Sequence, residues 1–151
     1  MEVQKCYYAS FNVGNVEVWS TELYLEKGDK KYAFELKSPL PNSDITKVSK
    51  EKMFKLYSMV EQPVLASFYA LPYNPYGKRE NYSWGFPCRW FDMKTDEVVM
   101  IGNEFWDFIG GKGTYQMFVE EVNKLGDEYK ERIYKEFLGI DSELTNTFRL
   151  E

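Results

Sequence analysis

TELYLEKGDKKYAFELK, residues 21–37, predicts a β-hairpin from which the rest of the fold can be placed. Apolar and polar residues alternate on both sides of Gly28-Asp29, and such alternation is typical of strands, whose successive side chains point to opposite faces. A two-residue loop with glycine first suits a type II′ turn. Paired positions are therefore expected to have residue numbers that sum to 57, as those of Gly28 and Asp29 do.

This register places three charged side chains on one face of the hairpin. Glu22 is expected directly across from Glu35, and Lys37 shares the face of Glu35 because it lies two residues further along the strand. Tyr24 and Glu26 are expected on this polar face too. The opposite, core-facing set is Leu23, Leu25, Tyr32, Phe34 and Leu36.

Two interpretations of the Glu-x-Lys pattern at Glu35 and Lys37 stay open. Exposed strands often carry such residues as a solvated, ion-paired face, and a different loop length would turn Glu22 towards the core. Alternatively, two carboxylates that face each other repel, and a divalent cation held by their oxygens would remove that repulsion. The second interpretation makes the hairpin a candidate metal site.

Composition excludes several kinds of chemistry. The 151 residues suit one domain with a sizeable core, 1–151, and 44% are hydrophobic. The chain contains no histidine, so Ser–His and Cys–His catalysis and most transition-metal sites are excluded. Cys6 and Cys88 lack metal-binding spacing, and no apolar run or signal peptide is evident, so we expect a reducing, cytoplasmic location with no membrane contact.

Charge is distributed unevenly along the chain. The net charge is −5, and residues 94–151 hold 13 acids against 7 bases. Residues 27–55 hold 8 lysines against 4 acids, so the basic segment surrounds and follows the Glu-x-Lys. A local basic face of this kind attracts phosphates, although it is also typical of a solvated helix surface.

A helix and a second buried strand are expected after the hairpin. Residues 38–42 contain two prolines, which end the strand, and Ser43 or Asp44 is a candidate N-cap for a helix over 45–59. Residues 63–70 are apolar on both faces. This strand, helix, strand order predicts a right-handed crossover and a parallel pair. A further short strand is expected at 98–101.

The carboxyl-terminal part predicts two helices, over 114–125 and 127–138, that end at Gly126 and Gly139. Residues 140–151 are expected to form a mobile tail. The glycines at 110–113 fit no phosphate-binding loop motif and are interpreted as a linker. The remaining aromatic candidates for base stacking are expected mostly to pack; they are Tyr73, Tyr76, Tyr82 and Trp84.

Three stretches together resemble a known enzyme family. They are YAFELKSPLPN at 32–42, PYNPYGK at 72–78 and GNEFWDFIGG at 102–111. An acidic residue in one strand followed by Glu-x-Lys in its partner resembles the PD-(D/E)xK nuclease superfamily, and the three stretches resemble TdeIII-like type II restriction endonucleases over residues 16–125. The resemblance implies an α/β (α+β) fold, with a mixed central sheet and flanking helices.

The resemblance also implies an active site. Glu22 and Glu35, with the backbone carbonyl of Leu36, would hold Mg²⁺, while Lys37 would orient or deprotonate the attacking water. The implied reaction is hydrolysis of double-stranded DNA at a short palindrome, for example of the GGNCC kind, by a homodimer or with a complementing subunit. The candidate DNA contacts are Asn42, Lys47, Lys50, Asn74, Lys78, Arg79 and Asn81.

Two departures from the family pattern leave an alternative open. Glu22 stands where such nucleases usually have aspartate, and family members extend further at the amino terminus. The chain is therefore also interpreted as a fragment, half of a split enzyme or a decayed copy. The alternative function is a non-catalytic module that binds DNA or protein, and the third is an interaction domain with an ion-paired hairpin.

Overall fold

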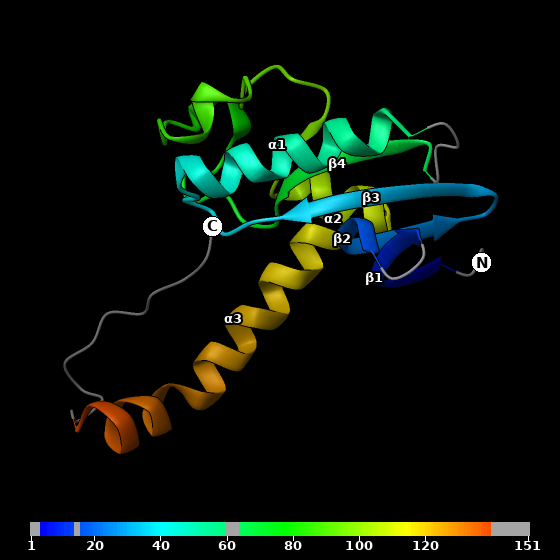
Figure 1. The fold of residues 1–151 in the computed structure, drawn as a ribbon. Helices are drawn as coiled ribbons and strands as arrows, with labels where there is room; N and C mark the ends of the chain where they lie inside the picture. Colours follow the sequence, from blue (N-terminus) through cyan, green and yellow to red (C-terminus); the bar gives the residue numbers. More distant parts are fainter. Residues whose placement is uncertain (1–3, 14–15, 60–63, 140–151) are drawn as a thin grey trace.

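A five-stranded mixed sheet forms the centre of the protein (Figure 1). The computed structural model describes residues 4–13, 16–59 and 64–139. The strands are β1 (Gln4–Val13), β2 (Val16–Lys27), β3 (Lys30–Leu36), β4 (Ala66–Leu71) and β5 (Val99–Ile101), which lie in this order across the sheet. β1, β2 and β3 pair antiparallel, whereas β4 pairs parallel to both β3 and β5. The predicted mixed sheet with flanking helices is confirmed.

The β2–β3 hairpin has the predicted register. Its ladder runs from Leu23 opposite Phe34 to Lys27 opposite Lys30, so every pair sums to 57. Gly28 has φ 59°, and Asp29 has no positive φ. This combination fits the type II′ turn, in which only the first loop residue needs the left-handed region.

α1 (Ser43–Tyr57) joins β3 to β4 and makes them a parallel pair, as predicted. Its N-cap is Asn42, one residue before the two predicted candidates, and the Asn42 side chain accepts a hydrogen bond from the Ile45 amide at 2.8 Å. The helix ends at Tyr57 rather than at residue 59. β4 starts at Ala66, and Pro63, the predicted start of that strand, lies outside the described residues.

Helices cover both faces of the sheet, so the structure does not fit the interpretation of a solvated face on the hairpin. Tyr24, expected on the polar face, is buried in a cluster with Ala33 and with Leu56 of α1. On the opposite face, Phe34 packs against Phe105 of α2 (Asn103–Gly110). No helix was predicted here from the sequence, where residues 102–111 contributed only to the family resemblance.

The segment between β4 and β5 is irregular but well packed. It contains two short 3₁₀-helices, η1 (Arg79–Asn81) and η2 (Pro87–Arg89). Tyr82 and Trp84 pack as expected, and they donate hydrogen bonds to the carbonyls of Pro39 and Pro41 at 2.9 and 2.8 Å. These bonds fasten the segment that directly follows Lys37.

α3 (Thr114–Arg132) is one continuous helix rather than two, and it continues as a π-helical turn, η3 (Ile133–Leu138). Gly126 lies inside the helix, because one glycine costs a helix about 1 kcal/mol and does not end it. The predicted end at Gly139 is confirmed by its φ of 63°. α3 extends away from the sheet (Figure 1).

Within the ranges described, no helix is long and apolar enough to cross a membrane. The predicted tail at 140–151 and the first three residues lie outside the described ranges.

Candidate active site

Glu35 is a buried carboxylate near the end of β3, with only 3% of the residue exposed. Its face of the strand turns towards α1, which covers it. Two ammonium groups approach: Lys52 of α1 lies 3.3 Å from both carboxylate oxygens, and Lys37 lies 3.4 Å from Oε2. Ser49, three residues before Lys52, donates a hydrogen bond to Oε2 at 3.4 Å. The carboxylate is therefore both buried and neutralised.

Lys37 lies between the two carboxylates of the hairpin. Its Nζ is 2.6 Å from Oε1 of Glu22 and 3.4 Å from Oε2 of Glu35. The Lys37 side chain is 11% exposed, whereas that of Glu22 is 41% exposed. The structure thus brings the three predicted catalytic side chains together, with Glu22 on the solvent side.

Glu22 lies beside an irregularity in the sheet. The β1–β2 ladder passes from the pair Tyr7–Tyr24 to the pair Ala9–Thr21, so Tyr8 alone stands opposite Glu22 and Leu23. A bulge of this kind bends a strand and changes the direction of a side chain, and bulges are frequent next to active sites. Thr21 also bridges to β3 by donating to the Phe34 carbonyl at 2.8 Å.

Burial raises the pKa of the Glu35 carboxyl above its ordinary value. Lys52 and then Lys37 act in the opposite direction, while Glu22 raises the pKa further. Burial also raises the pKa of Tyr69, the β4 partner of Glu35 in the ladder, to about 12. The Tyr69 hydroxyl shares a hydrogen bond of 3.0 Å with Thr46. It stays protonated at neutral pH and cannot serve as a general base.

The donor atoms at this site fit Mg²⁺. Glu22 and Glu35 offer carboxylate oxygens, Leu36 between Glu35 and Lys37 offers a backbone carbonyl, and hard oxygen ligands are those that Mg²⁺ prefers. In the described part of the chain, no group of three or more acidic, histidine or cysteine side chains forms a metal cluster. Mg²⁺ needs none, because it keeps several waters and takes one or two carboxylates together with substrate phosphates.

Most of the chain matches a family of known proteins. Residues 4–126 match the family model of the type II restriction endonuclease HinfI. The chain belongs to the HinfI family of type II restriction endonucleases. The matched region contains the sheet, α1, α2 and the first half of α3.

Individual enzymes of this class match over most of the chain. HgiCII of Herpetosiphon aurantiacus, a type II restriction enzyme, is 31% identical over 121 residues, which cover 78% of this chain and 44% of HgiCII. HgiEI of the same organism is 34% identical over 110 residues, or 70% of this chain and 39% of HgiEI. The chain thus spans less than half the length of these relatives, and no solved structure matches it.

Four of the seven candidate DNA contacts of this HinfI-family chain are exposed. Lys78 directly precedes the η1 turn and Asn81 is its last residue, while Lys47 is exposed on α1, 3.7 Å from Glu51. Asn42 is exposed too, although its side-chain oxygen caps α1. All four therefore stay candidates.

The other three candidates make contacts inside the protein. Asn74 is 3% exposed and holds its own turn together through hydrogen bonds of 3.0 Å with Tyr76 and Gly77. Arg79 donates to the carbonyls of Met93 and Asp96 and pairs with Glu104 at 3.1 Å. Lys50 donates to the Trp90 carbonyl and lies 4.8 Å from the centre of the Phe91 ring. A role for these three in DNA binding stays a prediction, and each already has partners inside the protein.

Lys52 and Ser49 contact Glu35, but neither was predicted as a site residue from the sequence. The available signal was spacing: Thr46, Ser49 and Met53 recur at helical intervals and are buried. A lysine next to that buried stripe lies within reach of whatever the helix covers, because its long stem can follow an apolar surface.

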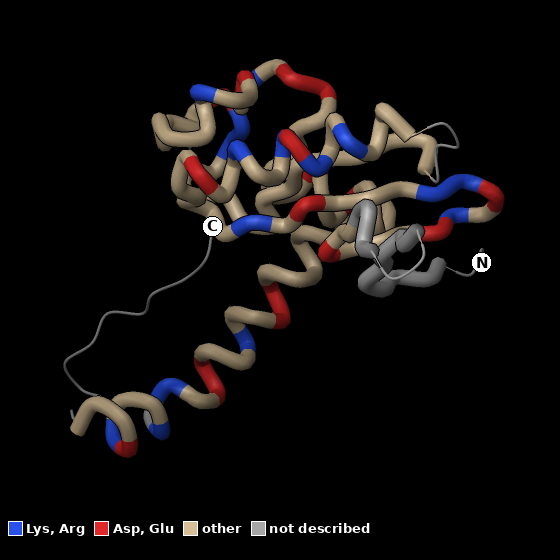
Figure 2. The backbone as a smooth tube through the Cα atoms, viewed as in Figure 1, with Lys and Arg blue, Asp and Glu red and all other residues tan. Residues whose placement is uncertain are grey.

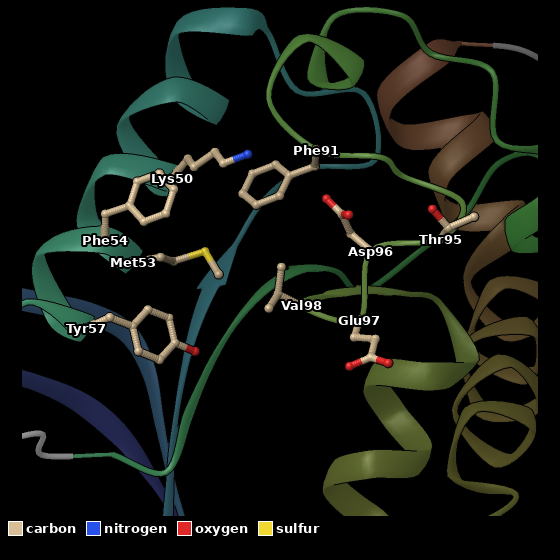
Figure 3. Close-up of a pocket in the computed structure, with 9 residues that line it drawn as sticks. All are labelled: Lys50, Met53, Phe54, Tyr57, Phe91, Thr95, Asp96, Glu97 and Val98. Carbon is tan, nitrogen blue, oxygen red and sulfur yellow. The ribbon is translucent and has the colours of Figure 1, made fainter.

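A pocket of about 470 Å³ lies elsewhere, between α1 and the segment before β5 (Figure 3). Its lining contains none of the three predicted catalytic residues. It is lined by Lys50, Met53, Phe54, Tyr57, Phe91, Thr95, Asp96, Glu97 and Val98. Figure 2 shows basic residues along α1 and near the hairpin tip with acidic residues among them, and both signs of charge along α3 as well.

Proposed function

We propose that this chain is the catalytic part of a Mg²⁺-dependent type II restriction endonuclease that hydrolyses double-stranded DNA. The observation that carries the proposal is the cluster of Glu22, Lys37 and the buried Glu35, in a protein of the HinfI family. An acidic residue on one strand and Glu-x-Lys on its partner fit a PD-(D/E)xK site. The stretches at 32–42 and 72–78 further support a TdeIII-like variant.

Each residue of the cluster has a chemical role in this proposal. Glu22, Glu35 and the Leu36 carbonyl would hold Mg²⁺, which when bound would acidify a water and neutralise charge on the scissile phosphate. The Lys37 ammonium would donate a hydrogen bond to the attacking water and to the phosphate oxygen on which charge develops. The short hydrogen bond to Glu22 would fix the direction of that ammonium.

The exposed polar residues around the cluster are proposed as DNA contacts. Asn42 and Lys47 at the start of α1, with Lys78 and Asn81, would contact phosphates and so position the duplex without specifying its sequence. We further propose a short palindromic target and a matching homodimer or complementing subunit. The exposed thiol of Cys88 suits the proposed cytoplasmic location, because free thiols persist in reducing compartments.

A second candidate function is a non-catalytic module that binds DNA or protein. Two observations favour it: the described residues offer only two acidic side chains at the site, and Lys37 and Lys52 already form ion pairs with them. Calorimetric titration with Mg²⁺ and Ca²⁺ separates the two functions. Binding at millimolar metal is expected for the endonuclease, and absence of binding favours the module.

Cleavage of plasmid DNA in the presence of Mg²⁺ tests the endonuclease directly. We expect discrete fragments whose sequenced ends share one short palindrome, and no cutting when EDTA removes the metal. Intact plasmid at high protein concentration with Mg²⁺ or Mn²⁺ would contradict the proposal for this chain.

A further inference from the structure

The two carboxylates of the site do not share one ammonium equally. Lys37 lies 2.6 Å from Glu22 but 3.4 Å from Glu35. Lys52 lies 3.3 Å from each oxygen of Glu35 and so straddles that carboxylate. Each acid therefore has its own cation, with Lys37 on Glu22 and Lys52 on Glu35.

The Lys52 side chain has room to move into solvent, whereas the Glu35 side chain does not. The Lys52 side chain is 31% exposed, whereas that of Glu35 is 4% exposed. Glu35 is fixed within a strand of the sheet and also accepts a hydrogen bond from Ser49 at 3.4 Å. Lysine carries a compact charge on a flexible stem, so its ammonium can leave for solvent without any movement of the backbone.

We infer that Lys52 is a positioning residue that occupies both oxygens of Glu35 until a divalent cation displaces it, and thereby sets the metal affinity of the site. The inference rests on the proposed metal-dependent function. Both oxygens are engaged by Lys52, and a metal ligated by Glu35 would approach the same atoms. Two cations about 4 Å apart repel each other in a partly buried site, so a metal on these oxygens would drive the Lys52 ammonium towards solvent.

This arrangement also explains how Glu35 stays buried without metal. A buried carboxylate with no partner is costly, and Lys52 supplies the partner. The same contact works against metal binding, because part of the binding free energy goes into displacing the lysine. Lys52 thus links the stability of the metal-free protein to its metal affinity, in opposite directions.

The test is a calorimetric titration of the whole chain with Mn²⁺ and with Mg²⁺, without DNA, at about pH 8, where carboxyl groups are ionised. The test variant is Lys52→Met, with Lys52→Gln as the alternative if the methionine variant fails to fold by circular dichroism. Lys47→Met is the matched control, because Lys47 lies on the same helix and pairs with Glu51 rather than Glu35. Lys52→Arg keeps the charge.

Loss of Lys52 is expected to tighten metal binding about three- to tenfold, from the repulsion removed. It should also lower the melting temperature of the metal-free protein, whereas Lys47→Met changes neither quantity appreciably. Lys52→Arg should restore weak, wild-type affinity. A purely structural lysine would lower stability and leave metal affinity unchanged.

The possible outcomes separate this inference from the proposed function. If the wild type binds metal and Lys52→Met binds no more tightly than Lys47→Met, the inference is overturned and the proposed function stands. If Lys52→Met or Lys52→Gln binds metal while the wild type and Lys52→Arg do not, the inference is supported, since the lysine then blocks the site. If no variant binds, both fail.

Discussion

At the scale of the residue, the site consists of two acids and two lysines that pair with each other, and it extends from the buried Glu35 to the solvent-exposed Glu22. Glu35 is 3% exposed, and the charge of its carboxylate is compensated by ammonium groups from Lys37, which directly follows β3, and from Lys52 of α1. Glu22 stands at the solvent edge, bonded to Lys37. The cluster has the features of a functional site, because buried carboxylates are rare in proteins and residues with shifted pKa values are concentrated at functional sites.

Replacement of Lys37 by methionine is expected to reduce the rate of Mg²⁺-dependent DNA cleavage by at least about 100-fold. The variant loses the group that we propose orients the water and stabilises charge on the phosphate. Lys31→Met, on an exposed position of the same strand, should cut at close to the wild-type rate. Single-turnover cleavage of plasmid DNA measures both variants. Equal rates for the two would remove Lys37 from the mechanism.

The raised pKa of Glu35 predicts a pH dependence of stability. The folded protein holds a proton on Glu35 more readily than the unfolded chain does, so this contribution is fully present below the ordinary pKa of 4.5. It is lost as the pH rises through the raised, folded-state pKa. Relative to Glu35→Gln, the metal-free wild type should therefore lose free energy of unfolding as the pH rises from about 4 to 7.

Urea unfolding at several pH values in EDTA measures this difference. A wild type that gains stability relative to Glu35→Gln over the same range would show that the lysines, rather than burial, dominate the environment of Glu35.

At the scale of the element, the hairpin could be predicted from the sequence, but the helices that pack on its two faces could not be placed there. The alternation around Gly28-Asp29 determines which residues pair, and the structure confirms that register. α2 could not be placed, because eight residues give too short a periodicity. The burial of Tyr24 and Glu35 depends on helices packing on both faces, which no local pattern in the hairpin encodes.

Asn42 offers a test of whether it is a cap, a DNA contact or both. Asn42→Ala should lower the free energy of unfolding by about 1 kcal/mol, because the Ile45 amide loses its acceptor. Asn42→Ser should keep the cap and most of the stability. If Asn42 also contacts DNA, the serine variant will bind duplex DNA more weakly at unchanged stability, which fluorescence anisotropy would detect.

The continuity of α3 predicts that Gly126→Ala stabilises the helix by about 0.5–1 kcal/mol. An added Cβ meets no atom within 4 Å, and the residue lies inside the helix. Gly139→Ala, at φ 63°, should have the opposite effect. Far-UV circular dichroism and amide exchange along α3 measure both. A loss of helicity in Gly126→Ala would support two separate helices, as the sequence alone suggested.

At the scale of the whole molecule, sheet order and helix placement bring together residues that are distant in the sequence. Lys52 reaches Glu35 only because the crossover through α1 lays that helix over β3. Glu22, Glu35 and Lys37 could be predicted because they lie on one hairpin. The internal role of Arg79 could not, because its partners lie later in the segment between β4 and β5 and in α2.

The most direct test of the proposed active site is cleavage of plasmid DNA by Glu35→Gln beside Glu51→Gln, an exposed carboxylate of α1 that pairs with Lys47. With Mg²⁺ present, Glu51→Gln should cut as the wild type does. Glu35→Gln should give no detectable cutting while its circular dichroism spectrum stays native. Wild-type cutting by a folded Glu35→Gln would contradict the assignment of the hairpin as the catalytic centre.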